Sequence, residues 1–569
     1  MNAGRRLIND IFNGFKILEI PFFQRAYVWG EEQWERLLDD LTDVCQTKKT
    51  HFFGSVILKQ RTTPADGQVG DRRRVIDGQQ RLTTLMIFFK VLCLKTENKK
   101  VFNKFFRLLN DEIALTHNHN DIDAFGRVMN KTDLELIDGK DAVTKCFNYF
   151  TENINEKKLD MDTILQKVLF VGIDLDENED EQQIFDRINS LGVKLTTAEL
   201  LKNYFFNKDN VKMYENYWKN IFESDDETKE YWDIEITTGR LKRTFIDLLL
   251  FAYLQIKVNS KELNVKTEDK IDFGRVEQLF QSYKAFIKNY MNGDTITILN
   301  ELREYAILFR NTFNRDIIDD DLPAESGTER INALIFGMDN TPLITYILFV
   351  LKENKDKNKT DELFEYIESF ICRRLIVRAI NKNYNQMFTD RLILNDIKTK
   401  EGFINYLKTQ DDKTNYMPND GDLQKGFHDS ILSNKIAASI LYMMESKIRR
   451  ITFHSTKLLG ISKYSLEHLM PKKWENNWGK LDNQSDIERR NRKLLTLGNL
   501  AIITQNLNAK IRDSNWETKK NGTKNDGLFV YAGNLETIAK YLNFPEWNES
   551  TIEQRANELY NYAVEIWKV

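Results

Sequence analysis

The positions of hydrophobic and polar residues near the start of the chain predict short strands and a helix. Apolar, strand-like runs occur at Phe15–Ile20, Phe52–Leu58 and Arg74–Ile76. Between the first two runs, Glu31–Val44 carries apolar residues on one face of a predicted helix: Trp34, Leu37, Leu38 and Leu41. This part of the chain is therefore expected to mix strand and helix.

A second helix is predicted after the third strand, because apolar residues again repeat at the helical period: Leu82, Leu85, Met86 and Phe89. Further along, Val168–Asp174 is predicted to be a strand and Gln182–Asn189 a helix that Gly192 ends. Another helix is expected to begin around Thr196, with a threonine cap and the carboxylate of Glu199 in its first turn.

From about residue 210 to about residue 400 the pattern predicts one helix after another. The most apolar stretches, Phe245–Tyr253 and Leu343–Leu351, are too short to cross a bilayer and are expected to be buried helices. The polar loop Gln410–Asp422 precedes the last domain. We therefore predict an α+β, predominantly helical protein with three parts, 1–210, 211–422 and 423–569.

Composition narrows this picture. A chain of 569 residues is too long for one hydrophobic core. The net charge of −4 excludes a basic protein that coats DNA, but residues 463–524 hold 13 Lys or Arg against 7 Asp or Glu. The four cysteines form no CxxC pair, which argues against a disulfide framework or a cysteine zinc site. A cytoplasmic protein without a signal peptide is expected.

The first candidate site is the segment Asp77–Arg81 between a predicted strand and a predicted helix. The start of a helix offers free backbone N–H groups to an anion, Gly78 allows close approach, and Arg81 can donate two hydrogen bonds to phosphate. Asp77 can cap the helix or hold hydrated Mg²⁺. No GxxxxGK[ST] motif is present. The alternative interpretation is an ordinary capped helix with an Asp-Gly turn.

Two further segments carry weaker signals. The extended segment Ile20–Trp29 combines Gln24, Arg25 and Tyr27, and could stack on a base and contact phosphate. Its aromatic residues could equally fill a core. The segment Phe185–Gly192 has the pattern of an ordinary helix end and by itself indicates no chemistry.

The second candidate site begins at Ser465–Pro471, a predicted strand that ends near His468. About thirty residues later come Asn499, Asn506 and Asn508. In a ββα-metal nuclease a histidine takes the proton of the attacking water, and a divalent metal stabilises the scissile phosphate. Lysines and arginines nearby could hold the DNA backbone: Lys472, Lys473, Arg489, Arg490, Arg492, Lys493, Lys510 and Arg512. The alternative is a structural histidine.

Together these motifs resemble the GmrSD-type, modification-dependent (type IV) restriction endonucleases. Four motifs follow one another in the same order as in the GmrS-like domain: Ile20-Pro21-x-x-Gln24-Arg25-x-Tyr27-x-Trp29, Phe53-Gly54-Ser55, Val75–Thr84 and Ile188-Asn189-x-x-Gly192-x-x-Leu195. Three later motifs resemble those of the GmrD-like nuclease domain: Leu466-Glu467-His468-x-x-Pro471, Leu497-Gly498-Asn499-Leu500 and Asn508. The middle third matches only in its helical character and in Arg373-Arg374.

The resemblance implies an N-terminal ParB/sulfiredoxin-like domain that binds and hydrolyses a nucleoside triphosphate. Its nucleotide-site residues would be Asp77, Gly78, Gln79, Gln80, Arg81, Gln24 and Arg25. The C-terminal domain would be a His-Me finger (HNH) nuclease that requires Mg²⁺ or Mn²⁺. Its DNA contacts would be Lys472, Lys473, Arg492, Lys510 and Tyr27.

On the same pattern His468 is the general base, Asn499 orients it or the substrate, and Asn508 joins Glu467 near the metal. The expected partner is modified double-stranded phage DNA in a bacterial cytoplasm, with no membrane; a homodimer is compatible with this interpretation. Two features depart from the pattern. Glu467 stands where aspartate is more familiar, and the long stretch from His468 to Asn499 leaves Asn506 or Asn508 as alternatives for the role of Asn499.

Two other functions fit these motifs. The chain could be a nucleotide-dependent sensor of modified DNA that works through a partner. It could also be a toxin that depletes nucleoside triphosphates by hydrolysis. The nuclease is the leading hypothesis, and the sensor is the main alternative.

Overall fold

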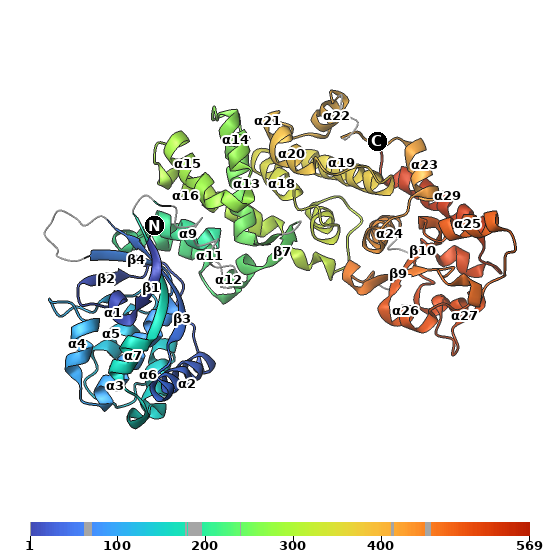
Figure 1. The fold of residues 1–569 in the computed structure, drawn as a ribbon. Helices are drawn as coiled ribbons and strands as arrows, with labels where there is room; N and C mark the ends of the chain where they lie inside the picture. Colours follow the sequence, from blue (N-terminus) through green and yellow to red (C-terminus); the bar gives the residue numbers. More distant parts are fainter. Residues whose placement is uncertain are drawn as a thin grey trace. The chain divides into compact units, whose positions relative to one another are not determined.

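The strand-like runs near the N-terminus pair into one mixed sheet (Figure 1). Its order is β1-β6-β3-β4-β2-β5, with strands β1 (Asn2–Leu7), β2 (Lys16–Glu19), β3 (His51–Gln60), β4 (Asp71–Asp77), β5 (Leu115–Thr116) and β6 (Val168–Leu175). The pairs β1–β6 and β3–β4 are antiparallel; β3–β6, β2–β4 and β2–β5 are parallel. This computed structural model describes residues 2–61, 71–176, 179, 196–238, 241–410, 415–449 and 457–569.

The sheet contributes to a main apolar core and to a smaller cluster of Ile57, Ile76, Ile173 and Leu175, and it is accompanied by helices. They are α1 (Ile8–Ile11), α2 (Glu31–Thr47), α3 (Gln79–Lys95), α4 (Lys99–Phe106), α5 (Ile122–Asn130), α6 (Ala142–Asn153), α7 (Met161–Lys167), α9 (Thr197–Phe205) and α10 (Val211–Tyr214). Helix α3 is buried on nearly all sides, because Thr83, Ile87 and Phe88 are as fully enclosed as the predicted apolar face. It is therefore the central helix of this core.

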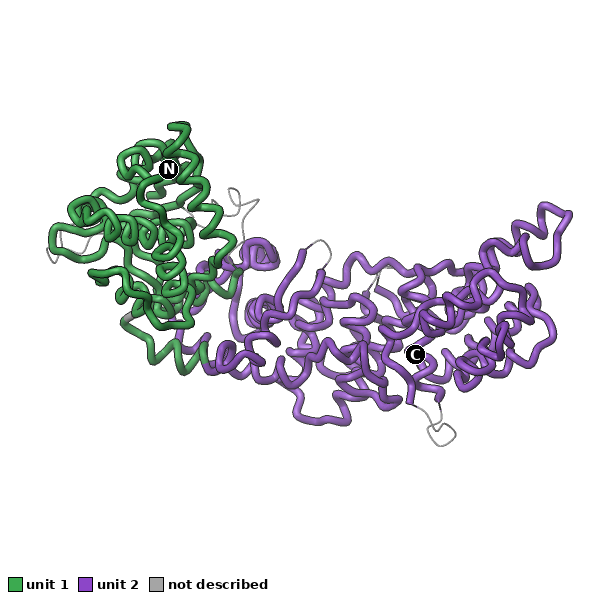
Figure 2. The backbone as a smooth tube through the Cα atoms, turned by 90° about the horizontal axis from the view of Figure 1, so that it is seen from below, with its two compact units in different colours: residues 1–219 green, residues 220–569 purple. Residues whose placement is uncertain are grey.

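The chain divides into two compact units, residues 1–219 and 220–569 (Figure 2). The second unit is mainly helical, with α11 (Asn220–Phe222), α12 (Asp226–Asp233), α13 (Phe245–Asn259), α14 (Thr267–Phe273), α15 (Leu279–Tyr290), α16 (Thr295–Thr312), α17 (Thr328–Asn332), α18 (Leu343–Glu353), α19 (Lys357–Ile376), α20 (Tyr384–Gln386), α21 (Leu392–Leu394), α22 (Lys400–Lys408), α23 (Asp420–Asp429) and α24 (Asn434–Ile448). A short hairpin joins β7 (Glu235–Thr238) and β8 (Leu241–Thr244).

The last part of the second unit contains a second small sheet. Strands β9 (Tyr464–His468) and β10 (Leu500–Thr504) pair antiparallel, with Leu500 opposite His468. The remaining helices are α25 (Gln484–Lys493), α26 (Gln505–Ile511), α27 (Trp516–Asn521), α28 (Leu528–Tyr531) and α29 (Glu549–Ile566). In chain order α25 lies between the two strands, and α26 follows β10 directly.

A buried ion pair joins the helical region to the end of the chain. Arg330 and Glu368 are each 1% exposed. Arg330 donates through Nε and Nη2 to the two carboxylate oxygens, at 2.6 and 2.8 Å, and Trp567 donates to Glu368 at 2.9 Å. Arg330 also donates to the Met443 carbonyl on α24. The region predicted as 211–422 and the predicted domain 423–569 thus lie in one compact unit.

Most predicted elements are confirmed. The α+β, mainly helical class holds, and the predicted strands and helices up to Phe89 correspond to β2, α2, β3, β4 and α3. The Thr196 cap is present, with its side chain accepting from the Glu199 N–H. The apolar stretches at 245 and 343 form buried helices α13 and α18, and among the described residues no helix is long and apolar enough to span a membrane. The predicted helix Gln182–Asn189 lies outside the described residues.

The Arg330–Glu368 pair makes a strong prediction about stability. Arg330→Met leaves the Glu368 carboxylate buried without its main partner, so the second unit should lose about 3–5 kcal/mol of unfolding free energy. Urea unfolding followed by tryptophan fluorescence measures this loss.

Two controls accompany that measurement. Exposed Arg303 on α16 provides a matched arginine, and Arg303→Met should change the unfolding free energy by less than about 0.5 kcal/mol. The double variant Arg330→Met, Glu368→Met removes both charges and should recover most of the loss. An Arg330→Met protein as stable as the parent would contradict the assigned role of the pair.

Candidate active site

The strand pair β9–β10 and helix α26 bring the predicted nuclease residues to one pocket of about 280 Å³. His468 and Glu467 come from the end of β9, and Asn508 comes from α26. The pocket is lined by Asn434, Leu466, Glu467, His468, Pro471, Lys472, Asn508, Arg512, Asp513 and Lys519. Three residues predicted from the sequence to carry the chemistry therefore share one cavity.

His468 is held in its neutral form. Burial, together with the nearby charges of Lys472 and Lys519, lowers the pKa of its imidazole to about 4. An imidazole with this pKa carries no proton on its basic nitrogen at neutral pH. It can therefore accept a proton, which is what a general base must do.

Glu467 is engaged by a buried lysine that the sequence analysis missed. Lys519, on α27, is 0% exposed and donates to Glu467 Oε1 and, at 2.8 Å, to the His468 carbonyl oxygen. Burial raises the pKa of Glu467 and lowers the pKa of Lys519. Nothing in the local sequence distinguishes Lys519 from its neighbour Lys520, because its role depends on a contact more than fifty residues away along the chain.

Asn508 spans the gap between α26 and β9. Its Nδ2 donates to Ser465 Oγ at 3.0 Å and to the Leu466 carbonyl at 3.1 Å. The side chain also lines the pocket, as His468 does. Asn506, the alternative considered from the sequence, is exposed on the same helix.

Asn499 has a structural place behind His468. It is 0% exposed; its Nδ2 donates to the carbonyls of Met470 and Leu494, each at 2.9 Å. Its Oδ1 accepts from the Met470 N–H at 2.9 Å and from Trp547 Nε1 at 2.8 Å. All four hydrogen-bonding positions of the amide are used by protein. Of the two predicted roles for Asn499, this geometry favours orienting the His468 strand over touching substrate.

The residues of the pocket suit a hard divalent cation only in part. Glu467, Asp513 and the Asn508 amide supply oxygen ligands, the type Mg²⁺ prefers, and Mg²⁺ commonly uses one or two carboxylates together with waters and phosphate oxygens. Among the described residues no group of three or more His, Cys, Asp or Glu is arranged to hold a metal. Any cation here would therefore depend on water and DNA phosphate to complete its shell.

The predicted DNA contacts fall in different places. Lys472 lines the pocket, and Lys473 is its exposed neighbour. Arg492 borders a separate surface hollow with Glu488, and Lys510 pairs with Asp526 at 3.4 Å. These positions leave the four cations on the surface of the second unit.

Tyr27 corrects one prediction. Its side chain is 3% exposed and its hydroxyl bonds Thr84 Oγ1 at 2.6 Å and accepts from Trp34 Nε1 at 2.8 Å. Tyr27 is therefore a core residue of the first unit and not a DNA contact. The alternative interpretation of its segment, that aromatic residues fill a core, is the right one here.

In the first unit, Asp77 and Arg81 form a small polar cluster at the start of α3. Arg81 Nη1 lies 3.5 Å from Asp77 Oδ2 and donates to the Ser55 carbonyl at 2.9 Å, while Ser55 Oγ donates to Asp77 at 3.3 Å. Gly78 has φ of 99°, and a Cβ there would lie 2.9 Å from Val56 Cγ2. Only glycine fits this turn without strain.

The glutamines of the motif hold protein backbone. Gln80 is 8% exposed; its Oε1 accepts from the N–H groups of Val28 and Trp29, and its Nε2 donates to the Ala26 carbonyl. Gln79 Nε2 reaches the Arg25 carbonyl at 3.5 Å. Buried Gln24 accepts from Asn203. These contacts bring the segment around Arg25 beside the start of α3, as the sequence motifs imply, whereas the Ile188–Leu195 motif lies outside the described residues.

Comparison with known proteins matches both ends of the chain. Residues 7–206 match the N-terminal domain of GmrSD restriction endonucleases, and residues 411–561 match the C-terminal domain of the same enzymes. An uncharacterized protein of Methanocaldococcus jannaschii is 25% identical over 296 residues, which cover 44% of this chain and 48% of that protein. The chain thus spans about half the length of this curated relative. With both domains present and in order, the chain belongs to the GmrSD restriction endonuclease family.

Proposed function

We propose that this chain is a divalent-metal-dependent DNA endonuclease that cuts modified phage DNA under the control of a nucleoside triphosphate. The observation that carries the proposal is the neutral His468 beside Asn508 and two carboxylates in one pocket. The antiparallel pair β9–β10, with α26 directly after β10, supports a His-Me finger. The membership of the chain in a restriction endonuclease family supplies the substrate class.

In this proposal His468 removes a proton from the water that attacks phosphorus. Asn499 and the Lys519 contact to the His468 carbonyl keep the end of β9 in place. Lys472 and Arg512 line the same pocket and would hold the phosphate backbone. Glu467, Asp513 and Asn508 would hold a Mg²⁺ or Mn²⁺ ion, which supplies Lewis-acid stabilisation of the charge on phosphate.

The first prediction concerns the base. His468→Ala should lower the rate of DNA cleavage by roughly a hundredfold to ten-thousandfold, because the water loses its proton acceptor. Cleavage of glucosylated, phosphorothioated and unmodified DNA in Mg²⁺ is the measurement.

His428 provides the matched control, because it is a half-buried histidine of the same unit whose ring bonds Asn557. His428→Ala should cut like the parent. Undiminished cutting by the His468→Ala protein would exclude His468 as the base.

The second prediction concerns pH. Since a general base works deprotonated and the pKa of His468 is about 4, kcat/KM should be level from about pH 6 to pH 8. It should fall about tenfold per pH unit below the pKa. Lys472→Met removes a charge that lowers this pKa, so the acid limb should move to higher pH.

Lys473→Met is the neighbouring control and should leave the limb in place, because Lys473 is exposed and is not a cause of the His468 shift. Circular dichroism across the same pH range separates loss of the fold from loss of the base. An acid limb near pH 6.5 in the parent would contradict the assigned environment of His468.

The third prediction concerns the nucleotide. We propose that Asp77, Arg81 and the backbone at Gly78 bind the phosphates, with Arg25 nearby. Arg81→Met should weaken nucleoside triphosphate binding by about tenfold or more, because a charged donor to phosphate is lost. Equilibrium binding of labelled ATP and GTP measures this.

Exposed Arg36 on α2 gives the control, and Arg36→Met should bind nucleotide as the parent does. Equal nucleotide affinity in the Arg81→Met and Arg36→Met proteins would remove the Asp77–Arg81 cluster from the proposal, while leaving the nuclease site untouched.

A second function is favoured by the contact between Lys519 and Glu467. A carboxylate already held by a buried lysine is a weaker cation ligand, which suits a sensor of modified DNA that acts through a partner. In that case the purified protein would bind modified DNA in the presence of nucleotide and would leave it uncut.

A further inference from the structure

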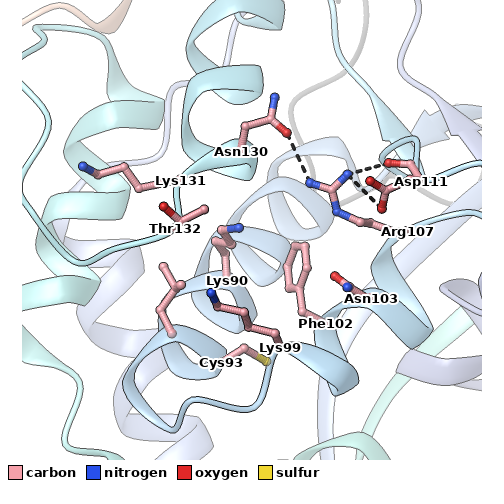
Figure 3. Close-up of a pocket in the computed structure, with 11 residues that line it drawn as sticks. Lys90, Cys93, Lys99, Phe102, Asn103, Arg107, Asp111, Asn130, Lys131 and Thr132 are labelled. Carbon is pink, nitrogen blue, oxygen red and sulfur yellow. Dashed lines mark hydrogen bonds and ion pairs between the residues drawn. The ribbon is translucent and has the colours of Figure 1, made fainter.

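A second polar pocket, of about 210 Å³, lies in the first unit at the far end of α3 from Asp77 (Figure 3). Its lining comes from α3, α4 and the segment after α5: Lys90, Cys93, Leu94, Lys99, Phe102, Asn103, Arg107, Asp111, Asn130, Lys131 and Thr132. Arg81 and Lys90 are nine residues apart on one helix, so roughly 13 Å of α3 separates the pocket from the Asp77–Arg81 cluster. The two sites are distinct.

Positive charge predominates in this pocket. Lys90, Lys99, Arg107 and Lys131 line it, against one carboxylate, Asp111, whose side chain is 83% exposed. Lys131 pairs with Asp133 at 2.6 Å, and Figure 3 shows its amine pointing away from the others. Lys90, Lys99 and Arg107 therefore line the cavity together, and the exposed Asp111 carboxylate pairs with Arg107.

Lys90 is the unusual member of the group. It is only 9% exposed, and its Nζ donates to the Met129 carbonyl at 2.7 Å and lies 5.0 Å from the centre of the Phe102 ring. Burial, together with the charges of Arg107 and Lys99, lowers the pKa of its ammonium to about 8. A buried cation that repels its neighbours is stabilised when an anion binds between them.

Arg107 is held by the carboxylate and carbonyl of Asp111 and by the amide of Asn130. Its guanidinium donates to the Asn130 amide oxygen at 3.2 Å, and its Nη1 lies 3.5 Å from the exposed Asp111 carboxylate. Asn103 and Thr132 add hydrogen-bonding groups on the rim, and Phe102 and Leu94 add apolar surface. Three cations beside apolar side chains suit a ligand with a charged head and a small uncharged body.

We propose that this pocket binds a small phosphorylated molecule, with its phosphate between Lys90, Lys99 and Arg107. The cavity is smaller than the roughly 300–1,000 Å³ of pockets that enclose drug-sized ligands, so the phosphate head and only a small attached group fit inside. A recessed, nearly buried lysine suits a compact anion better than the outer face of a DNA backbone. The pocket would be an effector site separate from the proposed nucleotide site.

The test is calorimetric titration of the full chain with inorganic phosphate and with methyl phosphate at constant ionic strength, with chloride and sulfate as comparison anions. It is done in the Arg81→Met background, so that phosphate bound at the Asp77–Arg81 cluster does not contribute. Phosphate should still bind the Arg81→Met protein. Adding Lys99→Ala should weaken this phosphate binding by about fivefold or more. Lys90→Met, which keeps the apolar stem, should weaken it further.

Lys100 is the matched control, because it is exposed and neighbours Lys99 on α4. Lys100→Ala should bind phosphate as the background protein does. Equal phosphate affinity in the Lys99→Ala and Lys100→Ala proteins would overturn the proposal. If the Lys90→Met protein does not fold, the Lys99→Ala result decides the test by itself. Binding of a 5′-phosphorylated oligonucleotide, without binding of either small phosphate, would also overturn it. None of these results depends on DNA cleavage or on nucleotide binding.

Discussion

The second unit is organised around charged groups taken fully out of water. Arg330 and Glu368 bind each other with two hydrogen bonds in a place where neither could remain charged alone, and they also contact α24 and Trp567. A bidentate pair of this kind accepts one geometry only. Elements that are far apart in the chain, from α17 to the final tryptophan, must therefore come together for either charge to be tolerated.

The same device supports the candidate nuclease site. Arg555 on α29 is 0% exposed and donates through Nη1 to the carbonyls of Leu497, Gly498 and Leu500, where β10 begins. From the other side, Asn499 holds the backbone just after His468. The strand pair is thus held by the side chains of Arg555 and Asn499, which bind backbone atoms. These contacts fix the position of the His468 imidazole.

Sequence patterns were informative where chemistry is local. The helical period of α3, the Thr196 cap and the apolar runs of α13 and α18 depend on neighbours along the chain, and each was predicted. The sequence around His468 and Asn508 already indicates a shared site, and the family resemblance adds their roles; both residues line one pocket. Lys519 was missed and Tyr27 was misplaced, because both depend on partners at long sequence separation. Burial of a lysine or tyrosine leaves no local signal, since both residue types are common on surfaces.

The Lys519 contact has a consequence for how the site is assembled. Small zinc domains leave their ligands mutually repelling until metal arrives, so folding and metal binding are one event. Here the buried ammonium of Lys519 already offsets the charge of Glu467. The pocket can therefore reach its shape during folding, with its architecture independent of the cation supply. A cation would bind to a pocket that is already folded. Its concentration would affect the rate of the reaction and not the stability of the fold.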